Sequence, residues 1–422
     1  MNVPAIERRG GGHAAEADVL IVGGGPAGSV LAGLLAQQDI DTVVLDRATF
    51  PRPKPCGEYL NPGVVAVLDR LGLLGAVLRT EPARISGWKM MTGSGVTATG
   101  RYAPTAPHGL GIQRSAVDEA LVCEAKRRGA RVVERVKVHG LRVAPSGERH
   151  AVTVEAVNGQ GRPVAWKARI VVGADGLRSV VARRLGLVRR RPGVRKVSLT
   201  CRLKGTGPPR GDGRLFLTGW GTVGLAPVHA SEPLWNGTVV VYVDRGARDL
   251  VTDPLGWFLA ALRQAPFRWD GDGPEVVGGP WASGPFDWAL RDAVSDRVLL
   301  VGDAAGSFDP LTGQGMFQAF RSAELAAPII VRAVRYGRSA AADLVDYRRA
   351  LSRLLRPTRV LQRVIEAAVS RNWAREIAVT RLRAAEPFMD RLVQVVGDTL
   401  PVRSLVRPDA LLSVLNRAAV QS

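Results

Sequence analysis

The segment Asp18-Val-Leu-Ile-Val-Gly23-Gly-Gly25-Pro-Ala-Gly28 decides the fold of this 422-residue chain, because three glycines in G-x-G-x-x-G spacing directly follow an apolar strand. The Ala- and Leu-rich run that begins at Ala27 can form a helix. Gly23 allows a tight turn, Gly25 lets the backbone approach a diphosphate, and Gly28 lets the helix pack closely on the strand. The free N–H groups at the start of this helix favour the negative charge of a diphosphate.

A second apolar strand at residues 42–45 ends at Asp46, which lies 18 residues after Gly28. An acidic side chain at this distance is expected to accept hydrogen bonds from a ribose. We expect Asp46 and its neighbour Arg47 to lie at the cofactor. Strand, glycine turn, helix and second strand together predict a βαβ unit that binds an adenine dinucleotide. By itself this unit does not distinguish NAD from FAD.

Two later segments carry a resemblance to a known family. Residues 168–179, ARIVVGADGLRS, resemble the Asp-Gly fingerprint of the class A flavin monooxygenase superfamily, and residues 297–315, RVLLVGDAAGSFDPLTGQG, resemble its Gly-Asp fingerprint. With the glycine turn, the three motifs occur in the family's order and span most of residues 18–327. The resemblance implies that the cofactor is FAD.

The resemblance also implies roles for individual residues. Asp175, followed by Gly176, orders the region between flavin and pyridine nucleotide, and Arg114, in QRSAVDEAL at 113–121, contacts the diphosphate side of the cofactor. No second G-x-G-x-x-G follows a strand. This fits class A enzymes, which bind NADPH or NADH transiently as a reductant, without a dedicated domain.

The third fingerprint also has an interpretation from its own residues. A buried strand is expected to end at Val301, so that Asp303, after Gly302, could accept hydrogen bonds from the ribityl hydroxyls or could cap a helix. Beyond Pro310, Gly313 and Gly315 open another helix. Its N-terminal N–H groups would face the edge of the flavin ring, where negative charge appears on reduction.

The segment PRPKPCGE at residues 51–58 resembles the Lys-x-Cys-Gly element of the geranylgeranyl reductase-like branch, which includes prenyl-chain reductases, hydroxylases and relatives of flavin-dependent halogenases. The resemblance places Cys56 and Glu58 near the isoalloxazine, and we take them as candidate catalytic residues. The alternative is a Pro-rich loop beside the cofactor in which Cys56 fills space. The chain lacks the Trp-x-Trp-x-Ile-Pro element of the halogenases, which disfavours halogenation.

The alternation of short strands and helices predicts an α/β fold: a Rossmann-like FAD-binding domain with an inserted antiparallel β-sheet substrate domain and a helical C-terminal region. Six of the nine tryptophans fall in the insert, where they either fill its core or line an aromatic or lipophilic pocket. In the C-terminal region we expect helices interrupted at Pro357, Pro387 and Pro401. The predicted boundaries are a mobile leader at 1–17, the FAD-binding domain at 18–190 and 291–330, the insert at 191–290 with parts of 80–112, and the helical region at 331–422.

The formal net charge of +20 raises the question of a nucleic-acid partner. Only seven of the 58 basic residues are Lys, and the arginines are spread over most of the chain. We therefore expect no nucleic-acid partner. Residues 331–422 carry 17 Arg against eight acidic residues, which favours packed helices with a solvated basic face and leaves a peripheral contact with a membrane open.

Cysteine usage and the N-terminus indicate the compartment. The three cysteines match neither a disulfide framework nor a zinc site. The N-terminal segment lacks the apolar core of a secretory signal, and no run of 18 apolar residues occurs. We expect a cytoplasmic protein, either free or associated with a membrane, and no metal.

Three functions remain open from the sequence. We favour an FAD-dependent monooxygenase that hydroxylates an aromatic or lipophilic small molecule with NAD(P)H and O2. The alternative is an FAD-dependent reductase that saturates an isoprenoid chain of the geranylgeranyl type. The third is a non-catalytic basic binding protein on a dinucleotide fold. None of the five histidines stands in a catalytic or metal-binding spacing, which fits a cofactor that carries the chemistry itself.

Overall fold

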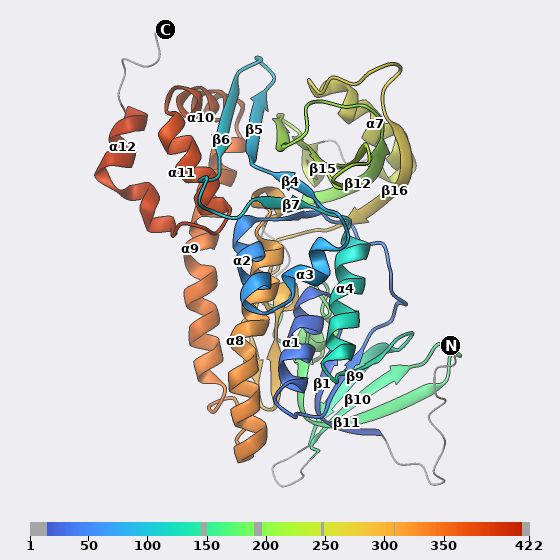
Figure 1. Ribbon diagram of the computed structural model, residues 1–422. Coiled ribbons are helices and arrows are strands. Elements are labelled where there is room, and N and C mark those ends of the chain that lie inside the picture. Colours follow the sequence, from blue (N-terminus) through green and yellow to red (C-terminus); the bar gives the residue numbers. More distant parts are fainter. Residues whose placement is uncertain (1–14, 145–149, 190–195, 246–248, 308, 416–422) are drawn as a thin grey trace.

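The computed structural model describes residues 15–144, 150–189, 196–245, 249–307 and 309–415. Of the predicted leader, residues 1–14 lie outside the described residues, and the first strand already begins at Ala15. Within the described part, the strands form three sheets of eight, seven and three strands. Figure 1 shows the second of these sheets above the helices that cover the first, with the C-terminal helices along one side.

The first sheet, called here the Rossmann sheet, is built around β1 (Ala15–Val22). β1 is parallel to β2 (Thr42–Leu45) on one side and to β11 (Pro163–Gly173) on the other. The strands β1 and β2 are buried on both faces where they pair, and this is why both have continuous apolar runs. Parallel pairing extends to β8 (Arg131–Val133) and β18 (Val298–Leu300) at the two ends. The antiparallel additions are β9 (Lys137–Val143), β10 (Val152–Val157) and β17 (Val294–Ser295).

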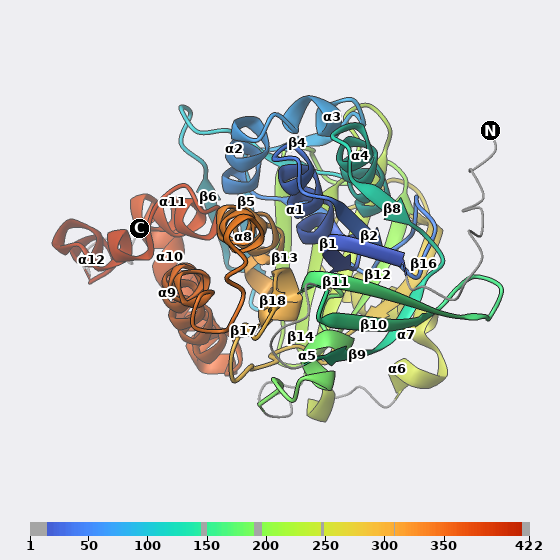
Figure 2. The same ribbon diagram turned by 90° about the horizontal axis from the view of Figure 1, so that it is seen from below.

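Helices cover one face of the Rossmann sheet. There α1 (Pro26–Ala36) packs between α4 (Arg114–Arg127) and α8 (Gly315–Tyr336), as Figures 1 and 2 show. Small residues allow this close packing: a Cβ added at Gly33 of α1 would lie 3.6 Å from the Cα of Ala125. The domain of the Rossmann sheet also contains the shorter helices α2 (Pro62–Arg70), α3 (Leu74–Leu78) and α5 (Val180–Arg184).

The second sheet, called here the inserted sheet, has the order β16-β12-β15-β14-β13-β5-β6. Two of its strands, β5 (Gly87–Thr92) and β6 (Thr97–Arg101), come from the earlier part of the chain, and β5 pairs in parallel with β13. The later strands pair antiparallel with their neighbours. They are β12 (Lys196–Lys204), β13 (Asp212–Leu217), β14 (Gly221–Pro227), β15 (Leu234–Tyr242) and β16 (Glu275–Ser283). The third sheet is small and consists of β3 (Tyr59–Leu60), β7 (Gly109–Gly111) and β4 (Ala83–Ile85).

Four of the six tryptophans of the insert fill its core. Trp235 is 1% exposed, and its ring lies edge-on to that of Trp269 with centroids 5.7 Å apart. Trp220 and Trp257 form a second edge-on pair at 5.5 Å. All four belong to one apolar cluster with residues of α7 (Pro254–Gln264), the helix that carries Trp257. Core filling is therefore the role of these four tryptophans.

The C-terminal region consists of α9 (Val345–Val369), α10 (Asn372–Ala384), α11 (Glu386–Val396) and α12 (Pro408–Leu415). α9 packs along α8, while α10 and α11 pack on β5 and β6. The expected interruption at Pro357 was wrong, because α9 continues through this residue. Pro357 and Arg353, whose carbonyl loses its donor, are both exposed, so water can replace the missing hydrogen bond.

A partly buried carboxyl joins the end of α11 to the rest of the molecule. Asp398 accepts hydrogen bonds from Asn61 Nδ2 at 2.7 Å and from Gln314 Nε2 at 2.9 Å. Asn61 caps α2, and Gln314 directly precedes α8. Burial raises the pKa of Asp398 to about 7, although both amide donors oppose this shift. The carboxyl group therefore titrates near neutrality.

We predict that Asp398→Asn stabilises the protein at neutral and alkaline pH. The pKa of Asp398 is higher in the folded protein than in the unfolded one. The wild-type protein therefore loses stability as pH rises through about 7, and the full pKa shift corresponds to about 4 kcal/mol in the free energy of unfolding. Asn avoids this loss, and it tolerates the φ of +57° at this position. Gln314 can rotate its amide so that Oε1, which has no partner, accepts from the new side chain.

Thermal unfolding of both proteins between pH 4 and pH 9 checks this. The advantage of the Asn variant should grow up to pH 7 and stay constant above it. Asp39→Asn is the matched control, since Asp39 also has a φ of +57° but is exposed. A variant that is less stable than the wild type at pH 8 would contradict the prediction.

Candidate functional site

The glycine turn after β1 is packed too tightly for a side chain at two of its positions, Gly23 and Gly28. A Cβ at Gly28 would lie 1.9 Å from the carbonyl oxygen of Gly23. Gly23 itself has a φ of +105°, and a Cβ there would lie 2.5 Å from the carbonyl oxygen of Ala174. The first and second fingerprints therefore meet in space, because Ala174 directly precedes Asp175.

Positive charge surrounds the open side of this turn. A Cβ at Gly25 would meet only the guanidinium groups of Arg52 and Arg114, at 3.7 and 4.0 Å. α1 begins directly after Gly25 without a side-chain cap, so its first N–H groups are free of intrahelical partners. The buried Nε of Arg52 also has no hydrogen-bond acceptor. These unpaired donors around an uncrowded backbone suit the diphosphate of a dinucleotide.

Asp46 holds the glycine turn to the end of β2. Its Oδ2 accepts a hydrogen bond from the N–H of Gly24 at 2.8 Å, and its Oδ1 accepts one from the N–H of Ala48 at 2.8 Å. Each oxygen keeps a second lone pair, so a ribose hydroxyl can still donate to this carboxylate. Arg47 is exposed, so it lies at the outer edge of this arrangement.

Arg114 is buried at the start of α4 and is held by Asp118, one turn further along. Its Nε donates to Asp118 Oδ1 at 2.7 Å. Burial lowers the pKa of Arg114, but Asp118 and the Cys56 thiol outweigh this effect and raise it. Arg114 is thus a permanent cation beside the glycine turn. Asp118 could have been found in the sequence, because it lies four residues after Arg114 on the same predicted helix.

Lys54 adds a third basic group, after Arg52 and Arg114, and lies between the second and third fingerprints. A Cβ at Gly176 would lie 3.3 Å from Lys54 Nζ. Burial lowers the pKa of Lys54, and Arg114 lowers it further, while Asp303 opposes the shift. The positions of Gly176 and Asp303 around one amine show that residues from widely separated motifs share a single site.

The third fingerprint packs on the start of α1. Gly302 has a φ of +60°, a Cβ there would lie 3.1 Å from the Cβ of Ala27, and its N–H donates to Ser322 Oγ at 2.8 Å. Asp303 lies in the short 3-10 helix η2 (Gly302–Ala305), which has no side-chain cap. Asp303 therefore does not cap this helix, which was the alternative to its predicted role at the cofactor. Its carboxylate receives no hydrogen bond from the described residues, which leaves it able to accept from ribityl hydroxyls.

The loop before α8, residues 309–314, is called here the flavin loop. It contains the 3-10 helix η3 (Pro310–Thr312), which is followed by Gly313 in the left-handed region at a φ of +66° and by Gln314. A Cβ at Gly315, the first residue of α8, would meet no atom within 4 Å, and α8 has no side-chain cap. The N-terminus of α8 is therefore open, as a contact with the edge of a flavin ring requires.

Asp175 organises the segment that follows β11. Its Oδ2 accepts from the N–H of Val180 at 2.6 Å at the start of α5. Its Oδ1 is buried and has no partner. Burial raises the pKa of Asp175, although Ser179 and the N–H of Val180 oppose the shift. The predicted contact of Asp175 with the region between flavin and reductant fits this unpaired oxygen and stays a prediction.

Glu58 joins the Cys56 loop, defined as residues 51–58, to two other elements. Arg202 of β12 contacts both of its carboxylate oxygens, with a distance of 2.6 Å to Oε2, and the N–H of Arg114 donates to Oε1 at 2.9 Å. Burial raises the pKa of Glu58, and Arg202 opposes this shift most strongly. Because both oxygens are engaged, Glu58 holds the loop between α4 and the inserted sheet. A catalytic role for it, which stays a prediction, would require one of these bonds to open.

Cys56 lies at a narrow pocket formed by the Cys56 loop, β3 and the first turns of α4 and α8. Its thiol interacts with the Arg114 guanidinium, and its carbonyl accepts from Asn236 Nδ2 of β15 at 3.3 Å. None of the six tryptophans of the insert lines this pocket. Its lining consists of Cys56, Glu58, Tyr59, Leu60, Ile112, Arg114, Val117 and Met316.

Comparison with known proteins identifies the family. Residues 16–202 match an FAD binding domain. The menaquinone reductase of Mycobacterium tuberculosis (strain ATCC 25618 / H37Rv) is 32% identical over 337 residues, which are 74% of this chain and 76% of the relative. The digeranylgeranylglycerophospholipid reductase 1 of Methanothermobacter thermautotrophicus is 27% identical over 415 residues, 94% of this chain and 98% of the relative.

The chain belongs to the class A flavin monooxygenase superfamily, in its geranylgeranyl reductase-like branch.

Solved structures agree with this fold. The flavin-dependent halogenase CmlS has a TM-score of 0.69 at 24% identity, over 90% of this chain and 66% of the halogenase. A geranylgeranyl bacteriochlorophyll reductase-like protein from Thermoplasma acidophilum has a TM-score of 0.66 at 19% identity, over 95% of this chain and 96% of that one. The predicted family, the fold class and the FAD cofactor are confirmed.

This family member is an FAD-dependent oxidoreductase, which argues against a non-catalytic binding protein. Bound FAD supplies the redox chemistry. The residues that would hold it are the glycine turn with Arg52 and Arg114 at the diphosphate, Asp46 at the ribose, Asp303 at the ribityl chain and the start of α8 at the ring. Direct contact of each of these residues with FAD stays a prediction.

Sequence reasoning missed several residues that build this flavoprotein site. In the sequence, Arg52 and Lys54 stand within the motif at residues 51–58, and nothing in that motif assigned them a role at the diphosphate. Arg202 and Asn236 come from strands of the insert, and 144 residues separate Arg202 from Glu58. No local signal connects such positions, because only the packing of the inserted sheet brings them together.

We predict that Gly28→Ala abolishes tight binding of FAD. The added Cβ would lie 1.9 Å from the carbonyl oxygen of Gly23, so the turn must move away from the diphosphate. The dissociation constant for FAD should rise at least about 100-fold, which is about 2.7 kcal/mol. Flavin absorbance of the purified protein and titration of the apoprotein with FAD measure this effect.

Gly93→Ala is the matched control, because a Cβ at Gly93 meets no atom within 4 Å. This variant should purify with the same flavin content as the wild type. A Gly28→Ala protein with unchanged affinity for FAD would show that the turn does not contact the cofactor.

Proposed function

We propose that this protein is an FAD-dependent reductase that saturates carbon–carbon double bonds of an isoprenoid-like, lipophilic substrate. The observation that carries this proposal is the position of Cys56, a proton-bearing group beside Arg114 and Glu58 at a narrow pocket. The apolar lining of this pocket is Leu60, Ile112, Val117 and Met316. The Cys56 loop is held there by Glu58 with Arg202 and by Asn236, so the thiol has a defined place between cofactor domain and inserted sheet.

Saturation of a double bond adds one hydride and one proton. Bound FAD, in its reduced form, would supply the hydride for one carbon. We assign the proton for the other carbon to the Cys56 thiol, which then regains a proton from solvent. Arg114, next to the thiol, stabilises the thiolate that remains after transfer. NADPH or NADH, bound transiently, supplies the two electrons that return FAD to its reduced form.

The names of the relatives support reduction over oxygenation. Both curated relatives described above are reductases, one named for menaquinone and one for a digeranylgeranyl phospholipid. The alignments cover 74% and 94% of this chain. The hydroxylase favoured by the sequence is the second candidate, and the aromatic cluster of Tyr59, Trp88 and Tyr102 beside the pocket favours it.

We predict that Cys56→Ser slows product formation about 10²- to 10⁴-fold, the usual contribution of a positioned general acid. The hydroxyl of Ser is a much weaker acid than a thiol. The assay is turnover of a geranylgeranyl-chain substrate by dithionite-reduced enzyme without oxygen, followed by mass spectrometry for gain of two hydrogens. FAD content should not change, and Cys123→Ser, at an exposed position, is the control.

The same assay separates the two candidates. Product formation without oxygen supports the reductase. A product that gains one oxygen atom, and only in air, would replace it by the hydroxylase. Equal rates for the Cys56 and Cys123 variants would remove Cys56 from the reaction.

We also propose that the turn between α9 and α10 contacts the surface of an anionic membrane. No helix in the described ranges has the length and apolar character needed to cross a bilayer, so the contact is peripheral. Four apolar side chains at this turn are 56–67% exposed. The acidic residue of this part of α9, Glu366, faces inward to Lys196 and Tyr242. The exposed residues are Arg353, Arg356, Val360, Arg363, Val364, Arg371, Trp373 and Ile377.

Sedimentation with vesicles tests this contact. Binding to phosphatidylcholine vesicles that contain about one third phosphatidylglycerol should exceed binding to pure phosphatidylcholine and should weaken with salt. Trp373→Ser with Ile377→Ser should reduce it several-fold. Val277→Ser, at an exposed position of β16, should have no effect. Equal binding of all three proteins would contradict the proposal.

A further inference from the structure

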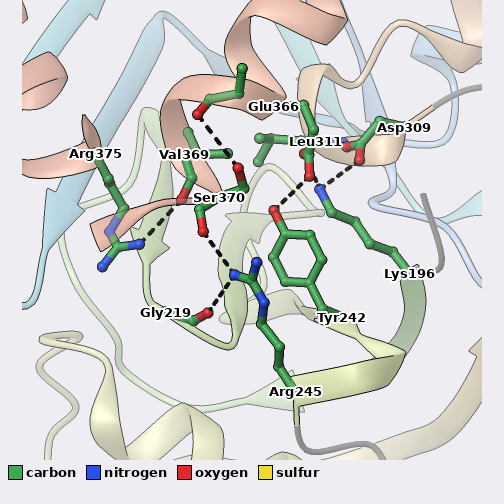
Figure 3. Close-up of polar contacts among 11 residues, drawn as sticks. Lys196, Gly219, Tyr242, Arg245, Asp309, Leu311, Glu366, Val369, Ser370 and Arg375 are labelled. Carbon is green, nitrogen blue, oxygen red and sulfur yellow. Dashed lines mark hydrogen bonds and ion pairs between the residues drawn. The ribbon is translucent and has the colours of Figure 1, made fainter. Parts of the chain in front are cut away.

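A buried ionic cluster connects the C-terminal region to the flavin loop. Lys196 of β12 is 5% exposed and contacts two carboxylates, Asp309 Oδ2 at 2.7 Å and Glu366 of α9. Tyr242, its cross-strand neighbour on β15, donates to Glu366 Oε1 at 2.7 Å. Figure 3 shows Lys196 between the two carboxylates, with the Tyr242 hydroxyl directed at Glu366. The predicted site residues do not include this cluster.

The cluster acts on the flavin loop through Asp309. While Oδ2 of Asp309 contacts Lys196, its Oδ1 accepts from the N–H of Leu311 at 2.8 Å and so caps η3. η3 leads through Gly313 directly to the N-terminus of α8. A displacement of Asp309 would therefore shift the helix end that faces the flavin.

α9 contacts the same loop at a second point. Gln362 Nε2 donates to Thr312 Oγ1 at 2.8 Å, and both side chains are buried. Gln362 and Glu366 lie one turn apart and so occupy the same face of α9. One helix face therefore holds both ends of η3: Gln362 directly at Thr312, and Glu366 through Lys196 at Asp309.

α9 is itself anchored to the inserted sheet at its C-terminal end. Arg245 donates to the carbonyl oxygens of Ser370 at 2.7 Å and Gly219 at 3.1 Å, and it lies 4.5 Å from the centre of the Tyr242 ring. Arg375 donates to the carbonyl oxygen of Val369 at 3.2 Å. These cations satisfy the last carbonyl groups of the helix. The face that carries Gln362 and Glu366 is thus fixed in position.

We propose that α9 is a positioning element for the cofactor: Gln362 directly, and Glu366 through Lys196, hold the flavin loop and thereby aim the N-terminus of α8 at the flavin ring. The partial positive charge of this helix end stabilises the negative charge of the reduced ring. The proposal depends on FAD as cofactor and not on the identity of the substrate.

A double-mutant cycle on Gln362 and Thr312 tests the proposal with no change of charge. Gln362→Leu and Thr312→Val each remove the hydrogen bond, so each should loosen the flavin loop. The ratio of affinities for reduced and oxidised FAD should fall about tenfold, which lowers the midpoint potential of a two-electron couple by about 30 mV. The double variant should show the same fall as each single variant, because one bond is lost in all three.

The potentials are measured by equilibration of the holoenzyme with redox dyes, so no substrate enters the test. Ala367→Leu, on the exposed side of α9, is the control and should keep the wild-type potential. A lower melting temperature with an unchanged midpoint potential would overturn the proposal, because the hydrogen bond between Gln362 and Thr312 would then only stabilise the fold. Additive shifts would also overturn it, since they would exclude a shared hydrogen bond.

The ionic contact has a second variant, Lys196→Met with Glu366→Leu. It removes one charge of each sign, so the net charge beside the flavin is unchanged and Asp309 can still cap η3. We expect a fall in potential of the same sign. A folded double variant with the wild-type potential would remove Lys196 and Glu366 from the positioning role. If this variant does not fold, the Gln362 and Thr312 cycle decides.

Discussion

The close approach of α1 to the end of β1 is the constraint on which the rest of the structure depends. It exists only because Gly28 has no side chain to separate it from the Gly23 carbonyl. The same turn packs on Ala174, and Ala27 at the start of α1 packs on Gly302. All three fingerprints therefore meet around this turn, and the open space beside their contact is the predicted cofactor site.

The electrostatics of this site follow from that convergence. Arg52, Arg114 and Lys54 bring positive charge to the open side of the glycine turn. Asp118 and Asp46 balance part of it, and Arg52 contacts both, at 3.5 and 3.8 Å. A dianionic diphosphate at the predicted position would complete the compensation, since cations gathered in a buried region are costly without anions. Bound FAD would then stabilise a site whose own charges are incompletely paired.

The inserted sheet and the C-terminal helices have a common physical role around the predicted cofactor site. Arg202 reaches from β12 to Glu58 and holds the Cys56 loop on one side of the site. Lys196, at the other end of the same strand, reaches Asp309 and Glu366 on another side. Asp398 adds a contact to Gln314 from the end of α11. The Rossmann sheet holds the Cys56 loop and the flavin loop only at one end. Strands and helices that are far away in the sequence therefore fix the position of the rest of each loop.

The sequence by itself determined the βαβ unit, the family, the FAD cofactor and the order of the α/β, inserted and helical regions. These properties depend on local patterns: the glycine spacing, the apolar strands and the Gly-Asp motif at the end of a buried strand. Only the tertiary structure decided that Arg202 and Asn236 hold the Cys56 loop, that four tryptophans form a core, and that α9 contacts the flavin loop. These contacts join residues that no periodicity relates, because they arise from the packing of one sheet or helix against another. For the same reason the predicted interruption of the helix at Pro357 was wrong. α9 tolerates this proline because that side of the helix is exposed, and the exposure follows from tertiary packing.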